Sequence, residues 1–242
     1  MRPLIVAAAA AALLSACGET PSRGSAVDAS AEATVNLPTA TTAPGVAPNP
    51  SGLTPPAVGE QGGSADWRTV VSATDAANLG RLDHAWRMAR AEAEDKGFAT
   101  QVEALGPLVD PNAGQTGKLQ PPPGTYRCRT IKLGSQDRAG LAYTAYPFFR
   151  CTIELTPGGD LVLTKTTGSQ RTRGLLYPDT DRRLVYVGAQ AWGLDETGFP
   201  RYGQQTIRDQ IGVFERIGSN RWRMVVPWPR VESKLEILEL VR

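Results

Sequence analysis

The fold is decided where the chain reads Tyr126-Arg127-Cys128-Arg129, because apolar and charged side chains alternate there with the period of two that marks a half-buried β-strand. A second stretch, Cys151-Thr152-Ile153-Glu154-Leu155, alternates in the same way. Cys128 therefore shares the apolar face of Tyr126, and Cys151 shares that of Ile153 and Leu155. We expect both cysteines to point into one core from strands that are close in sequence.

From Tyr126 onward, strand-like runs alternate with turn compositions such as Pro157-Gly158-Gly159-Asp160 and Gly218-Ser219-Asn220. Up to eight strands in about 115 residues favour an antiparallel meander closed into a small, lipocalin-like β-barrel, because closure removes exposed edges. A two-sheet sandwich is the alternative. The predicted strands are 126–133, 148–155, 161–166, 171–176, 184–189, 207–217, 222–227 and 235–241.

The region 66–106 is expected to be helical. Apolar residues recur at helical spacing over 75–96, which predicts one amphipathic helix with Thr74 as its N-cap and Gly97 at its end. A short second helix is expected over 99–105. The predicted fold class is therefore α+β: a mainly β domain, with its β part over 124–242, capped by one or two N-terminal helices.

The first seventeen residues have the pattern of an export signal, with a basic start and an apolar run from Leu4 to Leu14. This run is shorter than the ~20 apolar residues that cross a bilayer. Its ending, Leu14-Ser15-Ala16-Cys17, resembles a bacterial lipobox, in which the cysteine is acylated. We therefore expect a lipoprotein signal peptide over 1–17 and attachment to a membrane through lipid on Cys17. Glycine at position 18, where aspartate signals inner-membrane retention, favours the periplasmic face of the outer membrane.

The segment 18–65 is rich in proline, alanine and threonine and has no aromatic residue. Such a composition buries too little apolar surface to offset the entropy of ordering, which predicts a disordered tether with a span of about 40 Å. A single globular domain is expected over 66–242. It holds 24 of the 26 basic and 20 of the 24 acidic residues, a net charge of +4. This charge gives little attraction to nucleic acid, and no nucleic-acid partner is expected.

With Cys17 lipidated, Cys128 and Cys151 remain as an even pair in a compartment that permits disulfides. A bridge between them would stabilise the domain by roughly 3.5 kcal/mol in the chain-entropy account. Two buried free thiols are one alternative. A redox pair is the other, although redox pairs are typically spaced Cys-x-x-Cys.

Signals for catalysis are sparse. The chain has one histidine, His84, so we expect no metal site, and it lacks the glycine-rich and nucleophile motifs of nucleotide-binding and serine enzymes, so we expect no cofactor. Carboxylates remain as a possible acid and base pair for glycan hydrolysis. Arg208 and Arg216 are neighbours that would instead pair with them. The candidate carboxylates are Asp195, Glu196, Asp209, Glu215 and Glu232.

The least ordinary segment runs from Lys165 to Arg171 around a predicted hairpin turn. Its side chains Lys165, Ser169, Gln170 and Arg171 are candidates for holding an anionic or sugar ligand at a barrel mouth. The alternative is a turn whose charges face water. Tyr146 and Phe148 belong to a nearby aromatic cluster that either lines a pocket or fills the barrel.

Several stretches are shared with a known family, and the residues that carry the resemblance are Gly124-Thr125-Tyr126-Arg127-Cys128-Arg129, Tyr146-Pro147-Phe148-Phe149-Arg150-Cys151, Thr167-Gly168-Ser169-Gln170-Arg171 and Gly174-Leu175-Leu176-Tyr177-Pro178. Together they resemble the domain-of-unknown-function family 4893, found in exported proteins of alphaproteobacteria. The resemblance covers nearly all of 66–242. It implies a location outside the cytoplasm, and it implies no activity, ligand or catalytic residue.

These observations favour a lipid-anchored binding protein of the cell envelope. Its expected partner is a small apolar or glycan-like ligand in the barrel, or an envelope protein on its outside. The alternatives are an inhibitor of an envelope-attacking hydrolase and a carboxylate-dependent hydrolase acting on envelope glycans.

Overall fold

The computed structural model describes residues 66–242, and the predictions for Cys17 and for 18–65 fall outside this part of the chain. Its α-helices are α1 (Ala73–Gly80), α2 (Leu82–Ala93) and α3 (Ala99–Glu103), and its short 3-10 or π segments are η1 (Trp67–Thr69), η2 (Glu94–Phe98), η3 (Gly106–Leu108) and η4 (Thr206–Arg208). Its strands are β1 (Gly124–Ser135), β2 (Tyr143–Ala145), β3 (Phe149–Leu155), β4 (Leu161–Lys165), β5 (Gln170–Pro178), β6 (Leu184–Trp192), β7 (Asp209–Gly218), β8 (Arg221–Pro227) and β9 (Ser233–Val241).

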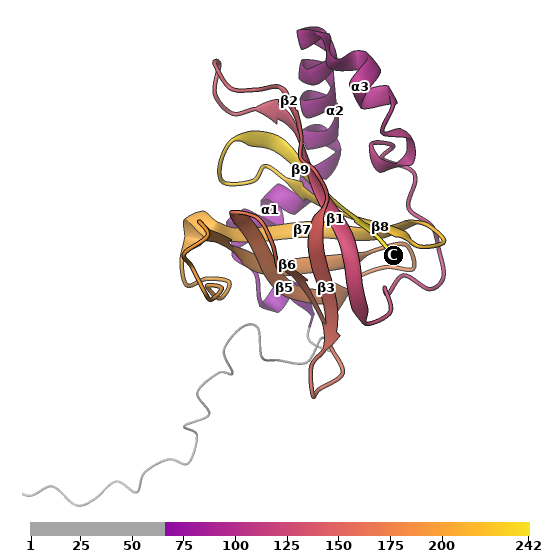
Figure 1. Cartoon of the computed structure of the whole chain (residues 1–242), viewed down its shortest axis with the longest axis vertical. Coiled ribbons are helices and arrows are strands. Elements are labelled where there is room, and N and C mark those ends of the chain that lie inside the picture. The colour runs from indigo at the N-terminus through magenta and orange to yellow at the C-terminus, as the bar shows by residue number, and fades with distance from the viewer. Residues whose placement is uncertain (1–65) are drawn as a thin grey trace, which may run out of the picture. The chain divides into compact units, whose positions relative to one another are not determined.

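The strands form one antiparallel sheet that closes on itself (Figure 1). Neighbours in sequence pair from β3 through to β9, and β9 then pairs with β1 along most of its length. The first half of β1 pairs with β3, and its second half pairs with the short strand β2. The barrel is thus confirmed over the sandwich. β2 was not predicted, and the eight predicted strands are present with ends that shift by three residues at most.

Side-chain alternation divides each strand between the interior of the barrel and its outer surface. Tyr126, Cys128 and Cys151 face inward as predicted, and each is 2% exposed or less. Tyr126 meets Trp222 edge to face inside the barrel, with ring centroids 5.8 Å apart. Leu155 lies on the inward-facing side of β3 but at the end of the strand, where it is 56% exposed.

The prediction of one helix over 75–96 is wrong. Ser72, not Thr74, is the N-cap, because its hydroxyl accepts a hydrogen bond from the Asp75 amide at 3.1 Å. The chain then bends at Arg81, whose backbone angles (φ −102°, ψ 22°) are not helical, so α1 and α2 are separate helices. Gly97, with a φ of 90°, ends the helical run as expected.

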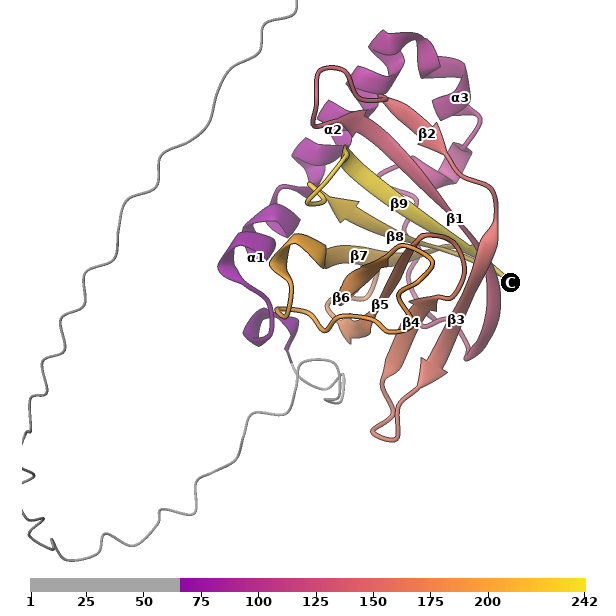
Figure 2. The same cartoon turned by 60° about the vertical axis from the view of Figure 1, so that its left-hand side comes forward.

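The bend between α1 and α2 lets the two helices cover different parts of the barrel wall (Figure 2). Leu79 of α1 packs in an outer cluster with Val185 and Ile211. Trp86 of α2 packs in another outer cluster with Ile131 and Ile237, on the face of β1 and β9. On one straight helix, Leu79 and Trp86 would lie on the same helix face and could not cover two separate parts of the barrel wall. None of the described helices is long and apolar enough to span a membrane.

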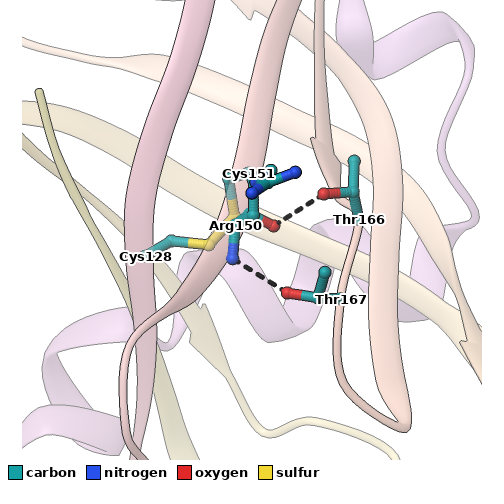
Figure 3. The surroundings of a disulfide bond; sticks show 5 residues. All are labelled: Cys128, Arg150, Cys151, Thr166 and Thr167. Atoms are coloured by element: carbon teal, nitrogen blue, oxygen red, sulfur yellow. Dashed lines mark hydrogen bonds between the residues drawn. A yellow bond between two sulfur atoms is a disulfide. The ribbon is translucent and has the colours of Figure 1, made fainter.

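The predicted disulfide between Cys128 and Cys151 is present and joins β1 to β3 (Figure 3). Beside it, the backbone of Arg150 is held to the hairpin between β4 and β5. The Arg150 amide donates to the Thr167 hydroxyl at 2.9 Å, and the Thr166 hydroxyl donates to the Arg150 carbonyl at 3.1 Å. The disulfide thus fixes the start of β3 against β1, and the hydrogen bonds fix it against the end of β4.

Candidate functional site

The interior of the barrel is apolar at one end and polar at the other. The apolar end is filled by large side chains such as Tyr126, Phe214 and Trp222, each 3% exposed or less. The polar end lies where β4 enters the turn 166–169 and β8 leads into the segment 228–232. We call this end the polar mouth, and its side chains are Thr130, Lys132, Lys165, Gln170, Thr172, Gln210 and Glu236.

A layer of hydroxyl groups separates the two ends. The Thr172 hydroxyl contacts the Tyr186 hydroxyl and donates to Gln210 Oε1 at 2.6 Å. The Tyr186 ring lies where any side chain at position 188 would stand, since a Cβ on Gly188 would come within 2.3 Å of the Tyr186 oxygen. Glycine at this position is therefore required by close packing. Burial raises the pKa of Tyr186 well above its usual range, so the phenol stays protonated.

Lys132 is held by an ion-pair network across the polar mouth. Its Nζ donates to Gln170 Oε1 at 2.7 Å, pairs with the Glu232 carboxylate, and lies 4.0 Å from Glu236 Oε2. Gln170 closes the network by donating to Glu232 at 3.1 Å. Burial opposes charge on Lys132, but Glu236 and Glu232 outweigh it, and the pKa of Lys132 is raised. Lys132 is therefore a fixed cation.

Glu232 reaches this network from a strained backbone. Its φ is 70°, in the left-handed region that side chains other than glycine rarely adopt. Such a conformation costs on the order of 1–3 kcal/mol and persists only where the surroundings enforce it. Strain of this kind gathers at functional sites, and here it sits directly over the polar mouth.

Lys165 lies beside Lys132 in a different environment. Within 66–242 its Nζ has no hydrogen-bond or ion-pair partner at close range, and it lies over the Phe149 ring, 4.5 Å from the centroid. The residue is 6% exposed. Burial lowers the pKa of Lys165 and the positive charge of Lys132 lowers it further, while Glu236 acts in the opposite direction. Lys165 is therefore a largely buried residue whose Nζ makes no hydrogen bond within 66–242, although that nitrogen is not among the fully buried unsatisfied atoms of the described chain.

A pocket of about 110 Å³ opens onto Lys165 from the outside. A second pocket of about 270 Å³ adjoins it through their shared residue Tyr146, and is lined by Lys132 and Glu232 among others. The smaller pocket is lined by Thr130, Tyr146, Phe149, Lys165, Ser169 and Gln170. It therefore places hydroxyl, amide and amine groups around a space with one aromatic wall.

Four of the six residues predicted as ligand-binding line this pocket: Lys165, Ser169, Gln170 and Tyr146. Arg171 does not, because it alternates to the outer face, where its guanidinium donates to the carbonyls of Gly193 and Glu196. Phe148 also lies outside, 37% exposed, with the Arg127 guanidinium 4.3 Å from its ring centroid. Ligand binding by any of these residues stays a prediction.

Sequence reasoning missed Lys132, Glu236 and Thr130, and it named Glu232 only as a possible catalytic carboxylate. A signal existed for Lys132, since it stands four residues after Cys128 and so on the same inward face of the strand. No comparable signal marked Glu236, because β9 is buried on both faces and carries one glutamate on each, Glu236 and Glu239.

Of the other four candidate carboxylates, Asp195 is exposed at the surface, and the remaining three make structural contacts. Glu196 pairs with Arg208, whose Nη1 is 2.6 Å from Oε1, and this interaction lowers the pKa of Glu196. Glu215 pairs with the fully buried Arg223 at 2.7 Å rather than with the adjacent Arg216. Asp209 accepts from the Gly203 amide at 2.9 Å.

His84 is exposed at the surface of α2, where its ring contacts the Trp228 ring at 5.4 Å between centroids. Across 66–242, no three histidine, cysteine, aspartate or glutamate side chains are grouped so as to hold a metal ion.

Comparisons with known proteins bear on the family and not on the ligand. Neither the curated proteins nor the solved structures contain a match to this chain. The sequence profile of one family, described as "Domain of unknown function (DUF4893)", matches residues 67–240. This match covers the helices and every strand of the barrel, so the chain belongs to the DUF4893 family.

Proposed function

We propose that the protein is a lipid-anchored binding protein of the cell envelope whose polar mouth binds a small carboxylate ligand. The observation that carries this proposal is the state of Lys165, a buried amine that faces a pocket and has no close partner within 66–242. A buried ammonium group is costly unless an anion or hydrogen-bond acceptor is near it. A ligand carboxylate is both an anion and a hydrogen-bond acceptor, so it would compensate the cost of burying the Lys165 ammonium group.

The other groups around the pocket suit the same ligand. Thr130 and Ser169 supply hydroxyl donors, and Gln170 supplies an amide. Lys132 lies beside them, and its raised pKa keeps its amine protonated and therefore positively charged. The apolar alternative is less well supported, since large side chains fill the apolar end of the barrel.

The volume of the pocket limits the size of the ligand that it can hold. At about 30 Å³ per water molecule, 110 Å³ corresponds to about four waters. It therefore suits a ligand of a few heavy atoms, or the acidic end of a longer ligand that continues past Tyr146 into the neighbouring pocket of about 270 Å³.

Location in the envelope forms the second part of the proposal. The lipobox-like Leu14-Ser15-Ala16-Cys17 supports acylation of Cys17, and Gly18 supports placement on the periplasmic face of the outer membrane. A disulfide in the domain agrees with an oxidising compartment. The domain would then meet small solutes that cross the periplasm.

Calorimetric titration of the full chain with glycolate, and with its neutral amide glycolamide, tests the ligand proposal. We expect glycolate to bind more tightly, and Lys165→Met to weaken it by roughly ten- to a hundredfold, the cost of one charge-assisted hydrogen bond. Lys118→Met, at an exposed lysine, serves as the matched control. Equal glycolate affinity in both variants would rule out Lys165 as the anchor.

The pH dependence provides a second readout in the same titration. A carboxylate is attracted to the ammonium form of Lys165, so binding takes up a proton wherever that residue is neutral in the free protein. Affinity is therefore full below the lowered pKa of Lys165 and falls as pH rises through it. An affinity that stays constant up to the normal lysine range would contradict the proposal.

A further inference from the structure

We propose that Lys165 captures small carbonyl compounds, its Nζ forming a reversible imine with an aldehyde or ketone that enters the pocket beside Ser169 and Gln170. This inference rests on the proposed function, because it uses the same pocket. It also names the ligand class more closely as a 2-oxo acid, in which a carbonyl adjoins the carboxylate.

The first support is geometric. A lysine attacks a carbonyl only when its nitrogen is reachable and its lone pair is not committed elsewhere. The Lys165 amine borders the pocket, with the Phe149 ring 4.5 Å away as one wall. Because no acceptor in 66–242 holds it, the amine can turn toward a ligand without breaking an existing bond.

The second support is the contrast with the other four lysines, which, like Lys165, lie in the described part of the chain. Lys132 and Lys234 are ion-paired, to Glu232 and Glu92 respectively. Lys96 and Lys118 are exposed to water. Among these five, Lys165 alone is buried without an ion-pair partner. It is therefore the position where reaction should be selective.

The third support is the protonation state of Lys165. Burial and the neighbouring Lys132 lower the pKa of Lys165, so more of it is the neutral amine at a given pH than of an exposed lysine. A desolvated lysine beside a second cation is a recognised way to activate this nucleophile. The charged or titratable groups around it are Lys132 on β1, Glu236 on β9, Glu232 in the segment 228–232, and Tyr146.

The proposed step needs no oxidant or reductant. The Nζ lone pair forms a bond to the carbonyl carbon, the carbon–oxygen π pair moves to oxygen, and a proton passes from nitrogen to that oxygen. The carbinolamine hydroxyl takes up a proton and leaves as water while the nitrogen lone pair forms the C=N bond, and the iminium nitrogen then returns its remaining N–H proton to solvent. One carbonyl compound and one amine thus give one imine and one water.

Hydroxyl groups are placed to assist the loss of water, because a hydrogen-bond donor stabilises the departing hydroxyl group. Thr130 and Ser169 provide hydroxyl groups at the same pocket.

Reductive trapping of the full chain tests the inference. The protein is incubated with glyoxylate, acetaldehyde or glycolate, each with sodium cyanoborohydride, and the adducts are located by peptide mapping and mass spectrometry. We expect glyoxylate and acetaldehyde to leave an adduct on Lys165 ahead of the exposed lysines Lys96 and Lys118. Glycolate has no aldehyde or ketone group and therefore leaves no adduct. The adduct at this position is lost in Lys165→Met, and the internal comparison among lysines stands even if that variant folds poorly.

The probes separate this inference from the function it rests on. Glycolate binding with no glyoxylate adduct at Lys165 overturns imine formation and leaves carboxylate binding in place. An acetaldehyde adduct at Lys165 without glycolate binding overturns carboxylate binding and leaves imine formation in place. Adducts spread over Lys96 and Lys118 with Lys165 unmodified overturn the inference outright. Capture of acetaldehyde should rise with pH through the pKa of Lys165, whereas capture of glyoxylate should pass through a maximum because its carboxylate binds less well as the ammonium is lost.

Discussion

Lys132 and Lys165 show how two identical side chains at one end of a barrel come to differ. Both face inward, and both are 6% exposed or less. Lys132 stands opposite Glu236 in the register of β1 and β9 and is bonded to Glu232. Lys165 stands opposite Cys151, and its Nζ lies over the Phe149 ring with no hydrogen bond or ion pair to the described residues. The first lysine completes a network, and the second lacks the partner that burial requires.

This contrast predicts stability changes of opposite sign. Lys165→Met replaces a largely buried amine that has no hydrogen bond within 66–242 by an apolar chain of similar length, which should raise the free energy of unfolding by about 1 kcal/mol. Lys132→Met leaves Glu232 and Glu236 without their cation and should lower it by about 3–5 kcal/mol. Urea unfolding of the two variants measures both. A loss of stability in Lys165→Met would mean that the domain itself satisfies this amine.

At the scale of the elements, the segment between β6 and β7 is held against α1 by hydrogen bonds of Tyr202. The Tyr202 hydroxyl donates to the Asp75 carboxylate and accepts from the Ser72 amide at 2.9 Å. Asp75 also pairs with Arg230 at 2.5 Å. Three segments remote in sequence thus meet at one buried carboxylate, which ties the helix to the barrel wall.

Tyr202 makes this junction sensitive to alkali. Burial, and then the hydrogen bond to Asp75, raise the pKa of Tyr202 to about 12. The folded state therefore holds this proton more tightly than the unfolded state, so the resulting stabilisation is complete below pH 10 and is lost as pH rises through about 12. Tyr202→Phe should flatten the fall in unfolding free energy over this interval. A fall of the same steepness in the variant would assign it to other groups.

Closure of the barrel is what creates the candidate site. Pairing of β1 with β9 sets Lys132 against Glu236, although these residues are about a hundred positions apart. The disulfide and the hairpin contacts at Arg150 hold Phe149 and Lys165 on the adjoining wall. The apolar end supplies the packed core, so the polar end can carry a group such as Lys165 that packing does not require.

The proposed anchor predicts where the protein is found in the cell. Several acyl chains on Cys17 would hold it firmly to a membrane, since each buried CH₂ contributes about 0.8 kcal/mol. Cys17→Ala should therefore move the chain from the membrane fraction to the soluble fraction, whereas Thr20→Ala should not. Fractionation followed by immunodetection measures this. Retention of Cys17→Ala in the membrane fraction would contradict lipid anchoring.

Local patterns in the sequence predicted every strand except β2, and they favoured the closed barrel over a sandwich and the disulfide over free thiols without excluding either alternative. Period-two alternation sets which face a residue occupies, and that face is decided within a few positions. The same rule placed Lys165, Ser169 and Gln170 around one hairpin at a barrel mouth. It did not place Arg171 or Phe148, whose alternation carries them to the outer surface.

Only the tertiary structure decided which residues surround Lys165 and what charge they carry. Glu236 and Glu232 reach the polar mouth through the pairing of β1 with β9 and through a strained turn, and neither contact is encoded by spacing along the chain. The bend at Arg81 likewise follows from two barrel faces that both require covering. Burial and long-range pairing determine the pKa of a side chain, so the chemistry of this site emerges only when the barrel closes.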